Sequence, residues 1–179
     1  VSMRHDTVAA ARGGETIPTS ILISTALGAY ARDASIASTP GLPSGVWRPV
    51  DGRGPTLVAA HPMPPLPRVM DQWDAGLRWI AEQCGDPDVI VAGDLNATVD
   101  HFAGLGARGG IIGGCRDAAA EVGAGAQGTW PVRLPLALAA PIDHVLVGAG
   151  WRAESFSVLD DFDDAGSDHR PIVATLTRR

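Results

Sequence analysis

The sequence predicts a single domain of mixed α/β or α+β class. The chain has 179 residues, of which 45% are hydrophobic, and this suits one globular domain with a core of its own. Short apolar runs containing β-branched residues recur along the chain and predict strands, while one longer stretch has helical periodicity. Helices and strands alternate only in part, and turn residues join several strand candidates, so we expect a mixed sheet layered with helices.

The N-terminal third is expected to contain a leader and then strands. Residues 1–18 mix polar residues and glycine without a period and are interpreted as a loop or leader, with the domain running from 19 to 179. Compact apolar runs predict strands at 20–24, 45–50 and 56–61. The second of these is expected to be an outer strand, followed by a hairpin loop at 51–55. The proline-rich segment 62–67 excludes a regular element there.

The segment 68–84 changes to helical periodicity. Its apolar positions recur every three or four residues, at Val69, Trp73, Leu77, Ile80 and Cys84. Gly85 is a typical helix stop, and the apolar run that follows predicts a strand at 88–93. A helix that leads directly into a buried strand is therefore expected in the middle of the chain.

The C-terminal half is expected to contain short helices between strands. Helices are predicted near 99–105 and at 116–122, with a glycine-rich loop at 104–114. The remaining strands are predicted at 142–147, 151–159 and 172–176. The longest apolar run, 134–142, is far shorter than the ~20 residues that a membrane-spanning helix needs.

Charge and cysteine content limit the classes of function. The formal net charge is -6, and all basic residues are arginine, so the chain lacks the bulk basic surface of most nucleic-acid-binding proteins. A local basic groove, or a metal ion that bridges to phosphate, remains compatible with this charge. Cys84 and Cys115 form no CxxC pair and predict neither a zinc site nor a disulfide framework. Two buried free thiols are favoured over a single disulfide.

The segment 88–98 is the first candidate functional site. Its apolar run ends at Gly93 and then presents Asp94 and Asn96, which share one face if the backbone is extended. Gly93 would let the chain turn tightly just before them. A carboxylate beside a carboxamide can position water, a metal ion or a phosphate. A capped turn explains the same residues equally well.

Two further segments are ambiguous when each is taken alone. His61 ends a predicted buried strand, where a hydrogen-bonded structural histidine is the commoner role and a catalytic histidine the alternative. Thr129 and Trp130 lie in a Gly-Thr-Trp-Pro segment that most simply provides an aromatic anchor for a loop.

Two Asp-His pairs are further candidates, and for the second pair a plain polar turn is the weaker explanation. Asp143 and His144 lie inside an apolar strand, where an ionised carboxylate is costly unless it has a partner. Asp168 and His169 precede the final strand, and adjacent Asp and His residues are typical of sites that handle phosphate or metal.

In chain order these segments resemble the endonuclease/exonuclease/phosphatase family, whose fold is that of deoxyribonuclease I. The resemblance extends from about residue 20 to residue 176 and is strongest to a bacterial branch. It is carried by a strand ending at His61, Gly-Asp-Leu-Asn at 93–96, Thr-Trp at 129–130, Ile-Asp-His at 142–144 and Ser-Asp-His at 167–169. It implies a four-layer α/β/β/α sandwich and a divalent-metal-dependent phosphoesterase that cleaves a phosphodiester or phosphomonoester with activated water.

The resemblance also implies a role for each matching residue. Asp94 would orient or deprotonate the attacking water, and Asn96 would hold a phosphate oxygen. His169 would donate to the phosphoryl group, with Asp143 supporting it. The remaining expected roles are a metal contact for Asp168 and Asp94, a general acid or phosphate contact for His61, and a substrate contact for Trp130. Mg²⁺ or Mn²⁺, with Ca²⁺ as an alternative, is the expected cofactor because hard cations prefer oxygen ligands.

One part of the family pattern is missing from this sequence. The family opens with a strand-helix-strand unit that carries an Asn and a metal-binding Glu. The chain has only four glutamates, Glu15, Glu82, Glu121 and Glu154, and none ends a predicted buried strand. The sequence therefore resembles the C-terminal portion of the family domain. A sheet without its first strands exposes an apolar face, so another chain that completes the sheet is a candidate partner.

Two functions from different classes follow. The first is the phosphoesterase, acting on a nucleic acid, a lipid headgroup or a small molecule. The second is a catalytically weak or inactive binding module that keeps the scaffold. Members of the bacterial branch often carry N-terminal membrane helices, so a membrane-anchored, extracytoplasmic full-length protein is compatible with the resemblance.

Overall fold

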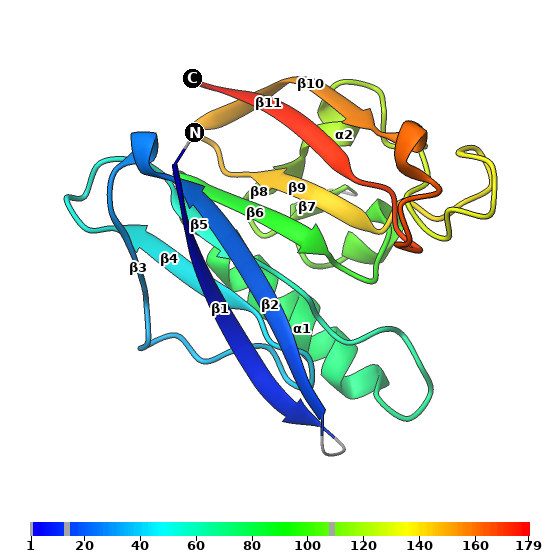
Figure 1. Ribbon diagram of the computed structural model, residues 1–179, viewed down its shortest axis with the longest axis horizontal. Coiled ribbons are helices and arrows are strands. Elements are labelled where there is room, and N and C mark those ends of the chain that lie inside the picture. The colour runs from blue at the N-terminus through cyan, green and yellow to red at the C-terminus, as the bar shows by residue number, and fades with distance from the viewer. Residues whose placement is uncertain (1, 13–14, 108–109) are drawn as a thin grey trace.

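A seven-stranded mixed sheet forms the centre of the molecule (Figure 1). The computed structural model describes residues 2–12, 15–107 and 110–179. The strands of the central sheet, in chain order, are β3 (Tyr30–Arg32), β4 (Gly45–Pro49), β5 (Thr56–Ala59), β6 (Val89–Asp94), β7 (Ile111–Ile112), β8 (Cys115–Asp117) and β9 (Asp143–Val147). Their spatial order is β3-β4-β5-β6-β9-β8-β7. Strands β5 and β6 run parallel, and the other neighbours are antiparallel, so the mixed sheet expected from the sequence is confirmed.

Helix α1 (Met70–Gln83) covers one face of this sheet. Its apolar positions Leu77 and Ile80 are buried, as the helical spacing predicts, and they pack with Val89 and Val91 of β6. Both valines are completely buried because β6 is a central strand pressed against the helix. The predicted unit of a helix leading into a buried strand is therefore confirmed.

The N-terminal residues form a hairpin, so their interpretation as a loop or leader is wrong. Strands β1 (Met3–Arg12) and β2 (Glu15–Ser24) pair antiparallel along their whole length. Val8 and Ile23 of this hairpin are buried against the central sheet. The Trp47 indole of the sheet donates a 2.7 Å hydrogen bond to Asp6 Oδ2 of the hairpin. The face of β1 that carries buried Val8 also carries Asp6, two residues away, so the strand lacks the regular alternation of apolar and polar residues that would reveal it.

A second hairpin lies beside the first on the same face of the sheet (Figure 1). It pairs β10 (Trp151–Val158) with β11 (Ile172–Arg178). Phe156 and Val158 of β10 are buried against the short helix α2 (Ala118–Glu121). Three layers are thus described: helix α1, the central sheet, and a layer made of the two hairpins.

Several element boundaries differ from the sequence predictions. Strand β4 pairs with β3 on one side and β5 on the other, so it is not an outer strand. The glycine-rich segment expected as a loop contains β7, and the start of the predicted helix at 116–122 belongs to β8. The short helix expected near 99–105 is a single 3-10 turn, η2 (Val99–Phe102). The remaining 3-10 turns are η1 (Thr25–Leu27) and η3 (Asp160–Phe162).

Cys84 and Cys115 form a disulfide, which corrects the expectation of two free thiols. Cys84 caps the C-terminus of α1 and Cys115 begins β8, with their Cα atoms 5.2 Å apart. Both residues are buried. The bond therefore ties the helix to the central sheet from within the core.

The face of the sheet between the two hairpins is partly open. Ala92 lies on central strand β6 and is exposed, although Val91 on the opposite face of the strand is completely buried. Pockets beside Ala92 reach toward both hairpins. Among the described residues, no helix is long and apolar enough to cross a membrane.

Candidate active site

The central strands bring the predicted polar residues together at one end of the sheet, where these strands begin or finish. Asp94 ends β6 and Asp143 begins β9, and these two residues face each other in the antiparallel register. His61 follows β5, and His169 lies in the loop before β11. Segments that lie far apart in the sequence thus meet at one end of the sheet.

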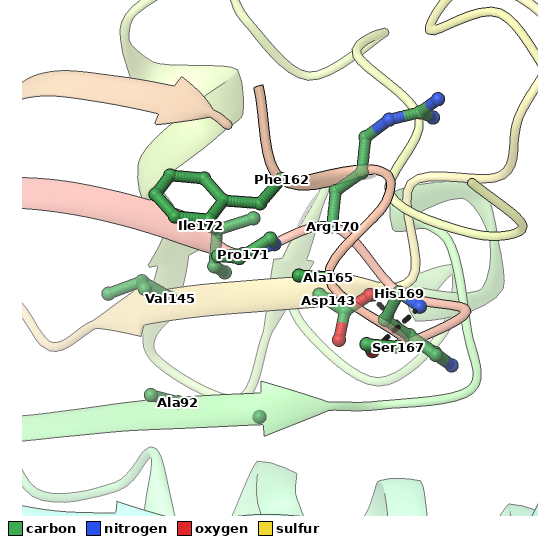
Figure 2. Close-up of a pocket in the computed structure, with 11 residues that line it drawn as sticks. Ala92, Asp143, Val145, Phe162, Ala165, Ser167, His169, Arg170, Pro171 and Ile172 are labelled. Atoms are coloured by element: carbon green, nitrogen blue, oxygen red, sulfur yellow. Dashed lines mark hydrogen bonds and ion pairs between the residues drawn. The ribbon is translucent and has the colours of Figure 1, made fainter. Parts of the chain in front are cut away.

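His169 and Asp143 form the shortest polar contact in this cluster. The Nδ1–H of His169 donates to Asp143 Oδ2 at 2.8 Å, and the backbone N–H of His169 donates to Ser167 Oγ. Figure 2 shows both contacts at the end of a pocket of about 410 Å³, with Ala92 on the neighbouring strand. The hydrogen bond that His169 donates to Asp143 raises the pKa of His169 despite the opposing effect of partial burial. Asp143 therefore has the partner that its place in an apolar strand requires.

Asp94 lies between two histidines. Its Oδ2 atom is 3.8 Å from His61 Nε2 and 3.9 Å from His169 Nε2, distances too long for direct hydrogen bonds. Burial raises the pKa of Asp94, and the charge of Asp143 acts in the same direction. Burial also lowers the pKa of His61, although Asp94 opposes that shift. A carboxylate with a raised pKa is a better proton acceptor than an ordinary exposed one.

Asn96 is held by a turn and not by extended backbone. Strand β6 ends at Asp94, and Asn96 has a left-handed φ of 48°. Its backbone N–H donates to Asp94 Oδ1 at 2.8 Å, and its side-chain Nδ2 donates to the Pro62 carbonyl at 3.0 Å. The capped turn that the sequence allowed is therefore present, and it is what fixes the two residues relative to each other.

Gly93 is required for a reason other than a tight turn. It is part of β6 and has a φ of 150°. A Cβ atom at this position would lie 1.9 Å from the Ala60 carbonyl oxygen. The absence of a side chain thus allows the segment before His61 to approach the end of β6 closely.

Three side chains form a group that fits a divalent cation. Asp94, Asp143 and His169 each offer one ligand-type atom within 4.8 Å of the others. Two carboxylates are suitable ligands for Mg²⁺ or Mn²⁺, which commonly keep water and substrate oxygens in their remaining positions. No glutamate belongs to this group among the described residues. Of its members, the carboxylates fit the ion best, because Mg²⁺ and Mn²⁺ prefer oxygen ligands to an imidazole nitrogen.

Asp168 lies outside this group. Its Oδ2 accepts a 3.0 Å hydrogen bond from the Trp130 indole, and that bond lowers the pKa of Asp168. The Trp130 ring lies beside His169, with 6.2 Å between the ring centroids. The structure therefore places Asp168 as the holder of Trp130, apart from the two clustered carboxylates.

Thr129 and Arg170 support the site, a role that the sequence did not assign to either residue. Thr129 is buried, and its Oγ1 accepts hydrogen bonds from the backbone N–H groups of Ile142 and Asp143. The buried guanidinium of Arg170 binds both oxygens of Asp163, at 2.7 Å each. It also donates to the carbonyls of Gly128, Val132 and Leu134. These contacts fix the segments that carry Asp143 and His169. For Arg170, the sequence offered one signal of a role at the site, its position directly after the Ser-Asp-His run.

His144 has a structural role behind the site. Its Nδ1 donates to Asp117 Oδ1 at 3.0 Å and its Nε2 to the Ala97 carbonyl at 2.8 Å, in the buried interior. Both ring nitrogens face acceptors, and only the protonated imidazole can donate to Asp117 and to the Ala97 carbonyl at the same time. Burial alone would lower the pKa of His144, but Asp117 and the Ala97 carbonyl outweigh it and raise that pKa.

Comparison with known proteins places this geometry in a family. The model of the Endonuclease/Exonuclease/phosphatase family matches residues 8–169, which covers most of the chain and includes Asp94, Asp143 and His169. The chain belongs to the endonuclease/exonuclease/phosphatase family. The family includes hydrolases that generally use divalent metal ions. Membership supports a phosphoesterase or nuclease kind of function for this chain.

Solved structures agree with the family assignment at the level of the fold. Humanized D. rerio TDP2 matches with 17% identity and a TM-score of 0.68, covering 98% of this chain and 76% of that chain. A functionally unknown conserved protein from Enterococcus faecalis V583 matches with 17% identity, a TM-score of 0.66 and coverage of 99% and 78%. The mannosyl-6-phosphatase of Bacteroides thetaiotaomicron VPI-5482 matches with 15% identity, a TM-score of 0.59 and coverage of 97% and 77%. No curated protein gave a significant match.

Proposed function

We propose that this member of the family is a divalent-metal-dependent phosphoesterase. The observation that carries the proposal is the grouping of Asp94, Asp143 and His169 at the end of two paired central strands. Ester cleavage at phosphorus needs a positioned water, neutralisation of developing charge and a proton for the leaving oxygen. This group, together with His61 and Asn96, offers side chains for each of these tasks.

The proposed roles follow from position. Asp94 accepts the proton of the attacking water as the new bond from water oxygen to phosphorus forms. His169, oriented by Asp143, donates through Nε2 to a phosphoryl oxygen on which negative charge builds. His61 donates to the leaving oxygen as its bond to phosphorus breaks, or to a second phosphoryl oxygen. Asn96 holds a further phosphoryl oxygen.

Asp94 and Asp143 would hold the metal ion. When bound, a hard divalent cation supplies charge neutralisation at the phosphoryl oxygens. We propose Mg²⁺ or Mn²⁺ on the basis of the two carboxylates, with Ca²⁺ as the alternative. Asp168 is proposed as an indirect contributor, because its carboxylate holds the Trp130 side chain.

The test is hydrolysis of bis(p-nitrophenyl) phosphate by this chain with Mg²⁺, with Mn²⁺ and with EDTA. We expect turnover with either metal, loss of turnover in EDTA, and loss in Asp94→Ala. Asp51→Ala serves as the matched control, because Asp51 lies in the hairpin loop between β4 and β5. Activity that survives EDTA, or that persists in Asp94→Ala, would contradict the proposal.

The second candidate is a weak or inactive module that receives another polypeptide. One observation favours it: Ala92 is exposed on a central strand, between two hairpins that leave this face of the sheet uncovered. A chain that binds phosphate and Mg²⁺ without turnover would support this candidate. Turnover by the chain alone, at a rate that Asp94→Ala abolishes, would exclude it.

A further inference from the structure

A separate pocket adjoins the proposed catalytic group on the side of the proline-rich loop. Its volume is about 540 Å³, which is within the range of sites for small organic groups. Asn96 and His169 form part of its wall, so a phosphate placed at these two residues would lie at its mouth. A group attached to that phosphate would extend into the pocket.

The walls of this pocket are mostly apolar. Leu66 and Ile142 contribute aliphatic surface, Pro64 and Pro65 contribute rings without backbone N–H donors, and Trp130 contributes an aromatic face. Its lining contains no arginine, aspartate or glutamate. Such a surface favours an uncharged, apolar ligand group and gives a second phosphate no cationic partner.

Two polar groups at this pocket, the His101 ring and the Trp130 indole N–H, already have hydrogen-bond partners within the protein. His101 Nδ1 accepts a 2.9 Å hydrogen bond from the Thr98 backbone N–H, and the His101 ring packs edge-on against Trp73. The Trp130 indole is bonded to Asp168, which fixes the orientation of the ring. The pocket therefore presents a held aromatic face and few free polar groups to its ligand.

Arg133 and Arg170 lie near the site, but neither lines the pocket, and the charge of Arg133 acts on the Asp168 carboxylate. The guanidinium of Arg170 is buried and bonded to Asp163 and to three backbone carbonyls, so it is not available to a second anionic group. The net charge of -6 acts in the same direction, since it opposes the approach of polyanions.

We propose that this pocket binds an uncharged, apolar group, such as an aryl ring system, carried by the phosphoester substrate. The inference rests on the proposed function, since it places the substrate phosphate at Asn96 and His169. It adds the substrate class: esters of an apolar alcohol or phenol are favoured over nucleic acids and multiply phosphorylated small molecules. Trp130 and Leu66 are the residues that determine this specificity.

The test measures binding without turnover. Isothermal titration calorimetry with 1-naphthyl phosphate and with methyl phosphate, in EDTA, where we expect no hydrolysis, gives the ratio of the two dissociation constants. We expect 1-naphthyl phosphate to bind at least ~10-fold more tightly, because the ring system buries apolar surface that methyl phosphate lacks. Using the ratio removes any general effect of a variant on phosphate binding.

The variants are Trp130→Ala and Leu66→Asp, with Val50→Asp as the matched control. Leu66 and Val50 are both exposed, at 55% and 67%, so neither change disturbs the core, and Val50 lies by the loop between β4 and β5. We expect the ratio to fall toward one in the first two variants and to stay unchanged in the control.

The outcomes separate this inference from the proposed function. A ratio below ~2 in the parent chain, no measurable binding of 1-naphthyl phosphate, or a ratio that both pocket variants preserve overturns the inference. Hydrolysis of bis(p-nitrophenyl) phosphate alongside such a result leaves the proposed function in place. Selective binding of 1-naphthyl phosphate that the two variants abolish supports the inference even if the chain shows no turnover.

Discussion

The Nδ1 atom of His169 lies 2.8 Å from Asp143 Oδ2. This hydrogen bond joins the loop before β11 to the first residue of β9. Because Nδ1 is committed to the carboxylate, the other nitrogen, Nε2, is the one that faces Asp94. The contact thus favours the protonated imidazole, whose Nε2–H is a donor, and sets the direction in which His169 can donate.

Asp143→Asn tests this orienting contact. The amide keeps the shape of the carboxylate but removes its charge, so we expect kcat for a phosphodiester to fall by roughly 10- to 100-fold. Steady-state kinetics at several metal concentrations would separate this effect from weaker metal binding. Asp161→Asn, an exposed change in η3, is the control. An unchanged kcat in Asp143→Asn would show that the contact does not orient His169.

Arg170→Lys tests the support of the loop that carries His169. Lysine lacks the planar guanidinium that binds both oxygens of Asp163 and several carbonyls at once. We expect the free energy of unfolding in urea to fall by about 2–3 kcal/mol. Arg53→Lys, on an exposed loop, should change it by less than ~0.5 kcal/mol. Equal stability of the two variants would contradict the role assigned to Arg170.

The Cys84–Cys115 disulfide should contribute measurably to stability. The two cysteines are separated by 31 residues, and a loop of this size corresponds to about 3.7 kcal/mol. We expect the Cys84→Ser, Cys115→Ser double variant to lose this amount in urea unfolding, and a reductant to have no further effect on it. A thiol assay on the unfolded, unreduced parent chain checks the bond directly, and two titratable thiols would contradict it.

The buried His144–Asp117 pair predicts a pH-dependent stability. The pKa of His144 is raised in the folded chain, so its contribution is complete below the unfolded value of about 6.5 and is lost as the pH rises through the folded pKa. Asp117→Asn should reduce stability by about 2–4 kcal/mol at pH 6 and flatten this dependence. Thermal unfolding from pH 5 to pH 9 tests both effects. A parent chain that gains stability as the pH rises from 5 to about 6.5, and keeps that gain at higher pH, would show that His144 is buried in its neutral form.

Local sequence patterns predicted the central part of this fold for physical reasons. Leu77 and Ile80 recur at helical spacing because α1 buries one stripe, and Val89 and Val91 form an apolar run because β6 is pressed against that helix. The pairing of Cys84 with Cys115 could not be predicted in this way, because it depends on the end of α1 meeting β8. Strand β1 escaped prediction because Asp6 shares a face with buried Val8, which breaks the alternation of apolar and polar residues.

The residues of the site likewise include some that local sequence could predict and some that it could not. Asp94, Asp143 and His169 each lie at, or a few residues from, the end of a recognisable strand, so their chemistry could be expected from the sequence. Thr129 and Arg170 act by binding backbone carbonyls and N–H groups of distant segments. No local spacing reveals such contacts, because they exist only after the chain has folded.

In the proposed function, the group of Asp94, Asp143 and His169 performs phosphoester hydrolysis. The most direct measurement is the Mg²⁺-dependent rate of bis(p-nitrophenyl) phosphate hydrolysis by the parent chain, by His169→Ala and by His5→Ala. His5 lies on the exposed side of β1 and provides a matched loss of one imidazole. We predict that the rate falls by at least ~10²-fold in His169→Ala and is unchanged in His5→Ala. Equal rates in all three proteins would contradict the account.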